Sequence, residues 1–221
     1  MSGWVLRAVV AIILGLAIGI WLDWRLGVTV AALVVIAGTL FQAKHGPIVP
    51  ATALATSAQR KTRKALRGLR RAGYHVLQAR AIPGSDQVID HLVIGPAGVF
   101  ALDSEGWDKR LPVRTVAGGM LYHGPFSQKE RLRHARWEAS RASSLVGAEM
   151  ERDVVVRPAM VIYGPTIPWD VASLRGVDVF AGGRIGKYFK RQARSTRKDR
   201  LDPEQIEAIS EAAARVLPPV K

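Results

Sequence analysis

Two long apolar runs open the chain. The first extends from Trp4 to Leu22 and contains Arg7 as its one charge, and the second extends from Leu26 to Phe41 and can continue to residue 43. A helix needs about 20 apolar residues to cross the hydrocarbon core of a bilayer. Because three residues separate the runs, the pattern predicts a transmembrane helical hairpin within residues 1–45, with helices at about residues 4–22 and 26–43.

A cleaved signal peptide and a buried helical hairpin of a soluble protein are the alternatives. The long first run, followed at once by another, argues against a signal peptide, and the scarcity of charges argues against a soluble hairpin. Lys and Arg are frequent after Phe41, whereas the short loop carries Arg25 alone. The positive-inside rule therefore predicts a two-pass protein of the cell membrane, with both termini and the remaining chain in the cytoplasm.

The pattern changes at Gly46-Pro47-Ile48-Val49-Pro50, which marks a linker over residues 46–57. Apolar residues at helical spacing predict helices over Thr56 to Ala72 and Lys129 to Val146, and a last helix that begins at the cap Asp202-Pro203. Helices and strands in this order predict an α/β domain over residues 58–221, in which helices flank a mixed central sheet. The predicted strands are residues 74–79, 88–94, 99–103, 113–116, 120–122, 154–163 and 177–180.

The net charge of the chain indicates which class of partner it could bind. The net charge of +14 indicates a polyanion, either nucleic acid or the anionic face of a membrane, although a basic surface without a partner gives the same value. For the basic helix Thr56 to Ala72, a solvated face, a lipid contact and a nucleic-acid contact all remain open. The basic run Lys187 to Arg200 is interpreted as a loop or helix end that faces a polyanion. The absence of cysteine excludes disulfides and thiolate metal sites.

Two carboxylates fall within the central apolar strands. Asp90 lies in the run 88–94, and Asp103 ends the run that follows a Gly-Pro-Ala-Gly turn. A register symmetric about that turn would bring the two acids opposite each other on neighbouring strands. Paired carboxylates repel each other unless a cation lies between them, and divalent ions such as Mg²⁺ favour oxygen ligands. The spacing fits either a metal site or two acids that face water at the strand ends.

The segments Pro83-Gly84-Ser85, Ile89 to Pro96, Gly98-Val99-Phe100 and Asp103-Ser104 with Trp107 resemble the nuclease-related domain, NERD. The resemblance extends from about Ala58 to about Leu145. It implies the restriction-endonuclease-like PD-(D/E)xK fold and cleavage of phosphodiester bonds in nucleic acid with Mg²⁺ (or Mn²⁺), without a small-molecule cofactor. Domains of this fold often dimerise, so the resemblance is also compatible with a homodimer.

By this resemblance, Asp90 matches the first metal-binding acid and Asp103 the acid of the (D/E)xK element. Glu105 stands where the family usually has lysine, and it could act as a base or a third metal ligand. The predicted catalytic and metal-binding set is therefore Asp90, Asp103 and Glu105. Further candidates are Gln59, nearest to a glutamate of the family's early helix, Lys109, which could reach back to the site, and Glu138 of the helix after the sheet.

Two departures from the family pattern, at Glu105 and Gln59, leave two functions open. The chain is either a nuclease tethered at the cytoplasmic face of the membrane, or a catalytically inactive module that binds nucleic acid or a partner there. Trp107 and Trp137 allow base stacking, but core packing is the commoner role of such residues. The histidines have no metal-ligand spacing, and residues 182–186 lack the pattern of a phosphate-binding loop.

Overall fold

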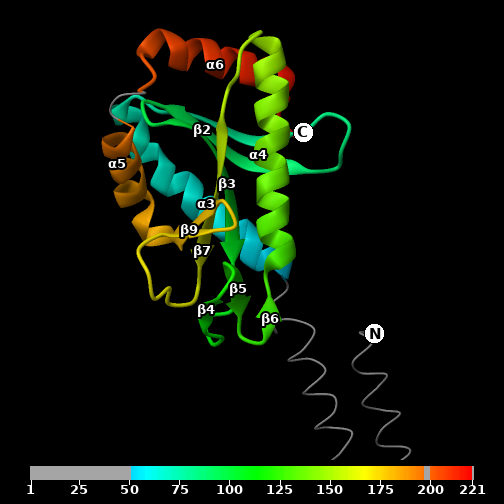
Figure 1. Cartoon of the computed structure of the whole chain (residues 1–221), viewed down its shortest axis with the longest axis vertical. Helices are drawn as coiled ribbons and strands as arrows, with labels where there is room; N and C mark the ends of the chain where they lie inside the picture. Colours follow the sequence, from blue (N-terminus) through cyan, green and yellow to red (C-terminus); the bar gives the residue numbers. More distant parts are fainter. Residues whose placement is uncertain (1–50, 197–199, 221) are drawn as a thin grey trace, which may run out of the picture. The chain divides into compact units, whose positions relative to one another are not determined.

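The computed structural model describes residues 51–196 and 200–220 (Figure 1). The predicted transmembrane hairpin lies outside these residues, as does the first part of the predicted linker. Within the described part, no helix has the length and apolar character needed to cross a bilayer.

A six-stranded mixed sheet forms the centre of the domain, in the order β1-β2-β3-β7-β9-β8. The first three strands form an antiparallel meander, β7 and β9 run parallel to β3, and β8 closes the far edge antiparallel to β9. This confirms the predicted mixed α/β architecture. The strands are β1 (His75–Ala81), β2 (Val88–Gly95), β3 (Gly98–Gly106), β7 (Val156–Tyr163), β8 (Ala172–Leu174) and β9 (Val177–Ala181).

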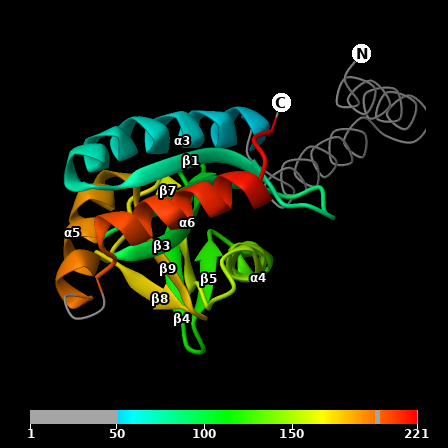
Figure 2. The same ribbon diagram turned by 90° about the horizontal axis from the view of Figure 1, so that it is seen from above.

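Helices cover both faces of this sheet (Figure 2). On one face, α3 (Ala51–Leu66) and the short 3₁₀ helix η1 (Arg67–Ala72) lie with α5 (Ile185–Ser195) over a core that includes Phe100 and Phe189. On the other face, α4 (Lys129–Glu149) and α6 (Pro203–Val216) cover a second core. Each fully buried large apolar side chain contributes about 1.5–3 kcal/mol. These two cores hold α3 and α4 on opposite sides of β3.

A second, three-stranded sheet connects β3 to α4. It consists of β4 (Val113–Val116), β5 (Met120–His123) and β6 (Phe126–Ser127), in that order. The β4–β5 hairpin was predicted, whereas the two residues of β6 are too few to give a sequence pattern. Leu121 of β5 packs in a cluster with Trp107 and with Leu132 of α4, so this sheet fixes the start of α4 against the main sheet.

Several predicted helix ends are confirmed. Helix α3 begins at Ala51, within the predicted linker and before the predicted start at Thr56, and ends at Leu66. The 3₁₀ helix η1 continues the chain to the predicted end at Gly73, whose φ of +77° is the left-handed conformation that favours glycine at a helix end. Asp202 and Gln205 form the reciprocal capping box that starts α6. The basic run after residue 184 is mostly helical, since Ile185, Tyr188 and Phe189 of α5 are buried against the sheet.

The pairing of β2 with β3 positions the candidate site. The register runs from Gly95↔Gly98 to His91↔Leu102, around a turn of two residues, as the symmetric Gly-Pro-Ala-Gly segment predicted. From there towards Val88, β2 pairs with β1 alone. Asp90 and Asp103 therefore come directly after the last β2–β3 pair, at the point where the two strands separate.

Candidate active site

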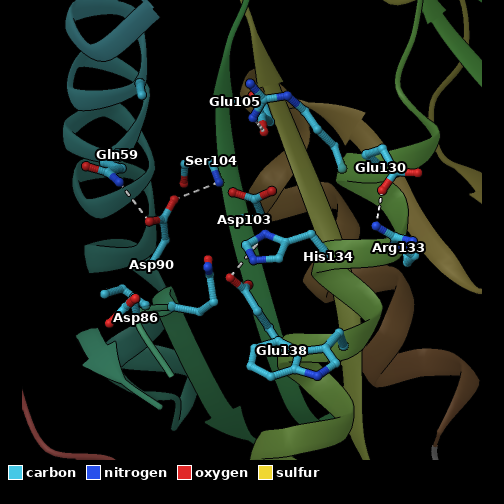
Figure 3. Close-up of a pocket in the computed structure, with 15 residues that line it drawn as sticks. Gln59, Asp86, Asp90, Asp103, Ser104, Glu105, Glu130, Arg133, His134 and Glu138 are labelled. Atoms are coloured by element: carbon cyan, nitrogen blue, oxygen red, sulfur yellow. Dashed lines mark hydrogen bonds and ion pairs between the residues drawn. The ribbon is translucent and has the colours of Figure 1, made fainter. Parts of the chain in front are cut away.

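An open pocket of about 900 Å³ lies where β2 separates from β3, with α3 on one side and α4 on the other (Figure 3). The pocket is acidic, although the chain as a whole has a net charge of +14. Concentrated negative charge in a partly desolvated pocket is costly unless cations or protons neutralise it. The acidic residues that line it are Asp86, Asp90, Asp103, Glu105, Glu130 and Glu138.

Asp90 is fixed by hydrogen bonds from two elements. Gln59 of α3 donates its side-chain N–H to Oδ1 at 2.7 Å, and the backbone N–H of Ser104 donates to Oδ2 at 2.9 Å. Burial raises the pKa of Asp90 to about 6, although both hydrogen bonds oppose this shift. Gln59, predicted as the counterpart of a family glutamate, thus orients Asp90 without adding another negative charge.

Asp103 faces the same pocket but has no such support. Among the described residues, none donates a hydrogen bond to its carboxyl group. Burial raises its pKa well above the ordinary value, and the nearby Glu105, Asp90 and Glu138 raise it further, whereas Arg131 lowers it. The carboxyl oxygens of Asp103 are therefore acceptors that an added proton or cation could satisfy.

Glu105 is engaged in a different way from the two aspartates. Its Oε2 accepts a hydrogen bond of 2.9 Å from Nε1 of Trp107, and its Oε1 forms an ion pair with Arg131 of α4. Trp107 itself is buried and stacks on His123, which makes it a core residue. Both oxygens of the buried Glu105 thus have partners, and the cation beside position 105 comes from α4.

One flank of α4 contributes three polar side chains to the pocket. Arg131, His134 and Glu138 recur at spacings of three and four residues, which places them on neighbouring turns of one helix side. Nδ1 of His134 lies 3.5 Å from Oε1 of Glu138. Glu138 was a candidate from the sequence, but Arg131 and His134 were missed. The sequence feature that could have identified them is their helical spacing, because they lie next to Leu132 and Ala135 of the buried apolar stripe.

Burial sets the protonation of this flank. It raises the pKa of Glu138 to about 8, with further contributions from the negative charges of Asp90 and Glu105. It lowers the pKa of His134, as does the nearby Arg131. At neutral pH the flank therefore presents a largely protonated carboxyl group and a neutral imidazole, and Arg131 carries its positive charge.

The structure thus brings most of the predicted site residues together. Asp90, Asp103, Glu105, Gln59 and Glu138 all line the pocket. Lys109, predicted to reach back, is exposed in the segment after β3 and does not line it. Within residues 51–196 and 200–220, no three acidic or histidine side chains are arranged to hold one metal ion together.

Glu138→Gln is expected to stabilise the metal-free protein at pH 8.5 but not at pH 4.5. The folded protein keeps the Glu138 proton up to about pH 8, whereas the unfolded chain loses it near the ordinary value of 4.5. Stability contributed by this proton is therefore lost as pH rises between these values. Thermal unfolding in EDTA at both pH values tests this. The control is Glu211→Gln on the exposed side of α6, and an equal shift of Tm at both pH values would contradict the prediction.

The chain was also compared with models of known protein families. Residues 55–163 match the family model of the nuclease-related domain, NERD. The match is somewhat longer than the resemblance seen in the sequence and includes every residue that lines the pocket. No curated protein and no solved structure matched the chain. The segment that builds the pocket, residues 55–163, is therefore similar to the nuclease-related domain family.

Proposed function

We propose that this chain is a membrane-anchored nuclease, which cleaves phosphodiester bonds of nucleic acid at the cytoplasmic face with Mg²⁺ or Mn²⁺. The observation that carries the proposal is the position of Asp90 and Asp103 side by side in one pocket of a nuclease-related domain. Acids on neighbouring strands of a mixed sheet also favour the restriction-endonuclease-like fold that the family resemblance implies. The anchor in this proposal is the hairpin predicted within residues 4–43.

Asp90 and Asp103 have the chemistry to hold the ion. Carboxylate oxygens are the ligands that Mg²⁺ prefers, and Asp103 lacks hydrogen-bond donors among the described residues. A cation between the two groups would relieve the repulsion from Asp90 that contributes to the raised pKa of Asp103. When bound, such an ion would polarise a phosphoryl oxygen and lower the pKa of a bound water. Glu138 lines the same pocket from α4.

Arg131 provides the positive charge that the substitution of lysine by Glu105 removes. Its guanidinium group is half exposed in the pocket, and the buried Glu105 holds it there. A guanidinium group can bind two phosphate oxygens at once. We therefore assign contact with the scissile phosphate to Arg131, and we assign to Glu105 the positioning of that arginine.

The surface beside the pocket supports a polyanionic substrate. Helices α3 and η1 contain no acidic residue, and their lysines and arginines are exposed. Helix α5, which contacts α3, adds exposed Lys187, Lys190, Arg191 and Arg194. Gln59 lines the pocket from α3, so the basic surface extends to its edge. The exposed cations of α3 and η1 are Arg60, Lys61, Arg63, Lys64, Arg67, Arg70 and Arg71.

The proposal is tested by a cleavage assay with the full-length protein in mild detergent. Single- and double-stranded DNA and RNA are incubated with Mg²⁺, with Mn²⁺ or with EDTA. We expect products with either metal ion and none with EDTA. The doubly substituted protein Asp90→Ala/Asp103→Ala, purified in parallel, is expected to give no products. Equal cleavage by this variant would assign the activity to a contaminant and overturn the proposal.

A catalytically inactive binding module is the second candidate. It is favoured by the two occupied oxygens of Glu105 and by the absence of a three-ligand cluster in the described residues. In this case the basic surface alone would bind nucleic acid. Affinity would fall steeply with monovalent salt and would not respond to EDTA. Such binding without any cleavage would favour this second function.

A further inference from the structure

Helix α4 presents two aromatic rings to the pocket. The rings of His134 and Trp137 are parallel within 3°, with centroids 6.3 Å apart, and both residues line the pocket. Trp137 is 41 % exposed, whereas Trp107 is buried and the indole N–H of Trp169 is bound to the backbone of Val179. The core-packing role expected for both candidate tryptophans thus holds for Trp107 and fails for Trp137.

We propose that Trp137, together with His134, forms a stacking platform for an unpaired base, so that the pocket accepts single-stranded nucleic acid or an unpaired end. This inference rests on the proposed function, because it takes nucleic acid as the ligand, and it adds the class of substrate. Aromatic side chains bind bases through their π faces. In a duplex, neighbouring bases cover these faces, so only a single strand or a frayed end can offer them.

The charges around the platform set the orientation of the strand. Ionised carboxylates on the acidic side of the pocket, such as Asp90, repel a phosphate wherever no cation is bound. Arg131 attracts a phosphate and lies six residues before Trp137, which is about 9 Å along the helix axis. A phosphate at Arg131 and a base on Trp137 can therefore belong to one short stretch of strand.

The size of the pocket agrees with this ligand. Its volume of about 900 Å³ lies within the range that holds small molecules, which matches one or a few nucleotides rather than a segment of duplex. His134 and Glu138 also offer polar atoms next to the rings. Such atoms can form hydrogen bonds with the edge of a splayed base, which a duplex would keep paired.

The test measures binding of the full-length protein in EDTA, a condition in which the proposed cleavage does not occur. Three labelled DNAs share one sequence: a single strand, a blunt duplex, and a duplex with a single-stranded overhang. We expect tighter binding of the single strand and the overhang than of the blunt duplex. Trp137→Ala is expected to weaken single-strand binding by at least about fivefold, because one stacked base contributes this much or more.

The controls separate stacking from general effects on folding. Trp137→Phe keeps a ring and should retain most of the single-strand affinity, and Val155→Ala, at an exposed apolar residue away from the pocket, should change nothing. Blunt-duplex affinity should be the same in all variants. Equal losses on the single strand and the duplex with Trp137→Ala, or no loss on either, would overturn the inference. Absence of cleavage together with the expected binding pattern would overturn the proposed nuclease activity and leave this binding site standing.

Discussion

Asp103→Asn is expected to reduce metal-dependent cleavage by at least about 100-fold while making the metal-free protein more stable. Replacing residues that only support metal ligands often costs 10- to 100-fold, so loss of a direct ligand should cost at least as much. The gain in stability has a separate cause. Burial and the neighbouring carboxylates raise the pKa of Asp103. At neutral pH, folding therefore costs free energy, either because Asp103 must keep a proton or because its charge is buried beside other negative charges.

The sign of the stability effect follows from the direction of that pKa shift. The unfolded chain ionises Asp103 near the ordinary value of 3.8, whereas the folded protein resists ionisation until a higher pH. Stability is therefore lost as pH rises above 3.8, and the neutral asparagine removes this loss. We expect a higher Tm for the variant in EDTA at pH 7, with no difference at pH 3.

The effect of Mg²⁺ on Tm tests the same variant, Asp103→Asn, for loss of a metal ligand. An ion that binds only the folded protein raises Tm with its concentration. We expect Mg²⁺ to raise the Tm of the unsubstituted protein and to leave that of Asp103→Asn almost unchanged. Asp153→Asn, at an exposed residue outside this pocket, serves as the control for the change of charge. A variant that cleaves normally, or that responds to Mg²⁺ as the original does, would contradict the assignment of Asp103.

Gly164→Ala is expected to lower stability by about 3 kcal/mol or more, which corresponds to a fall in Tm of roughly 6–12 °C. Gly164 has a φ of +114°, a conformation that side chains other than hydrogen rarely adopt. An added Cβ would also lie 2.1 Å from the backbone oxygen of Trp107. Because Trp107 is tied to β7 by the hydrogen bond from its N–H to the oxygen of Tyr163, this contact cannot be relieved by a side-chain rotation.

The expected damage also reaches the pocket, because Trp107 donates the hydrogen bond that orients Glu105. Gly186→Ala in α5 is the matched control, since no atom lies within 4 Å of its added Cβ and alanine favours a helix. We expect that control to leave Tm unchanged or to raise it slightly. Thermal and denaturant unfolding of the three proteins would measure this, and equal Tm values for Gly164→Ala and the original protein would refute the argument.

The pair of central strands could be predicted because its determinants are local. Two apolar runs around a turn of two residues allow one register that keeps the apolar side chains inside, and Asp90 and Asp103 come directly after the last pair of that register. The pairing of Arg131 with Glu105 could not be predicted in this way. It depends on how α4 packs across β3, and this is set by the core around Leu132 and by the intervening small sheet.

Pro158 shows how tertiary context decides a local question. A proline inside a predicted strand argues against a central position, because it cannot donate a hydrogen bond. In β7, Pro158 pairs with Ala101 of β3, while the pairing with β9 begins only at Ala159. Pro158 therefore lies in the part of β7 that pairs with β3 but does not yet pair with β9. The sequence contains the proline but not the position at which β9 joins.

Because the surface of α3 and α5 is basic and the pocket is acidic, a nucleic-acid strand of the proposed kind would meet two electric fields in succession. The basic surface attracts phosphates from a distance, and monovalent salt screens that attraction. The carboxylates of the pocket would repel the same phosphates from the position beside Asp90 and Asp103 until divalent ions neutralise them, whereas stacking on Trp137 would not depend on those ions. Capture and entry are therefore separate steps with opposite responses to ions. The ratio of divalent to monovalent cations, rather than total ionic strength, would then set how often a captured strand reaches Asp90 and Asp103.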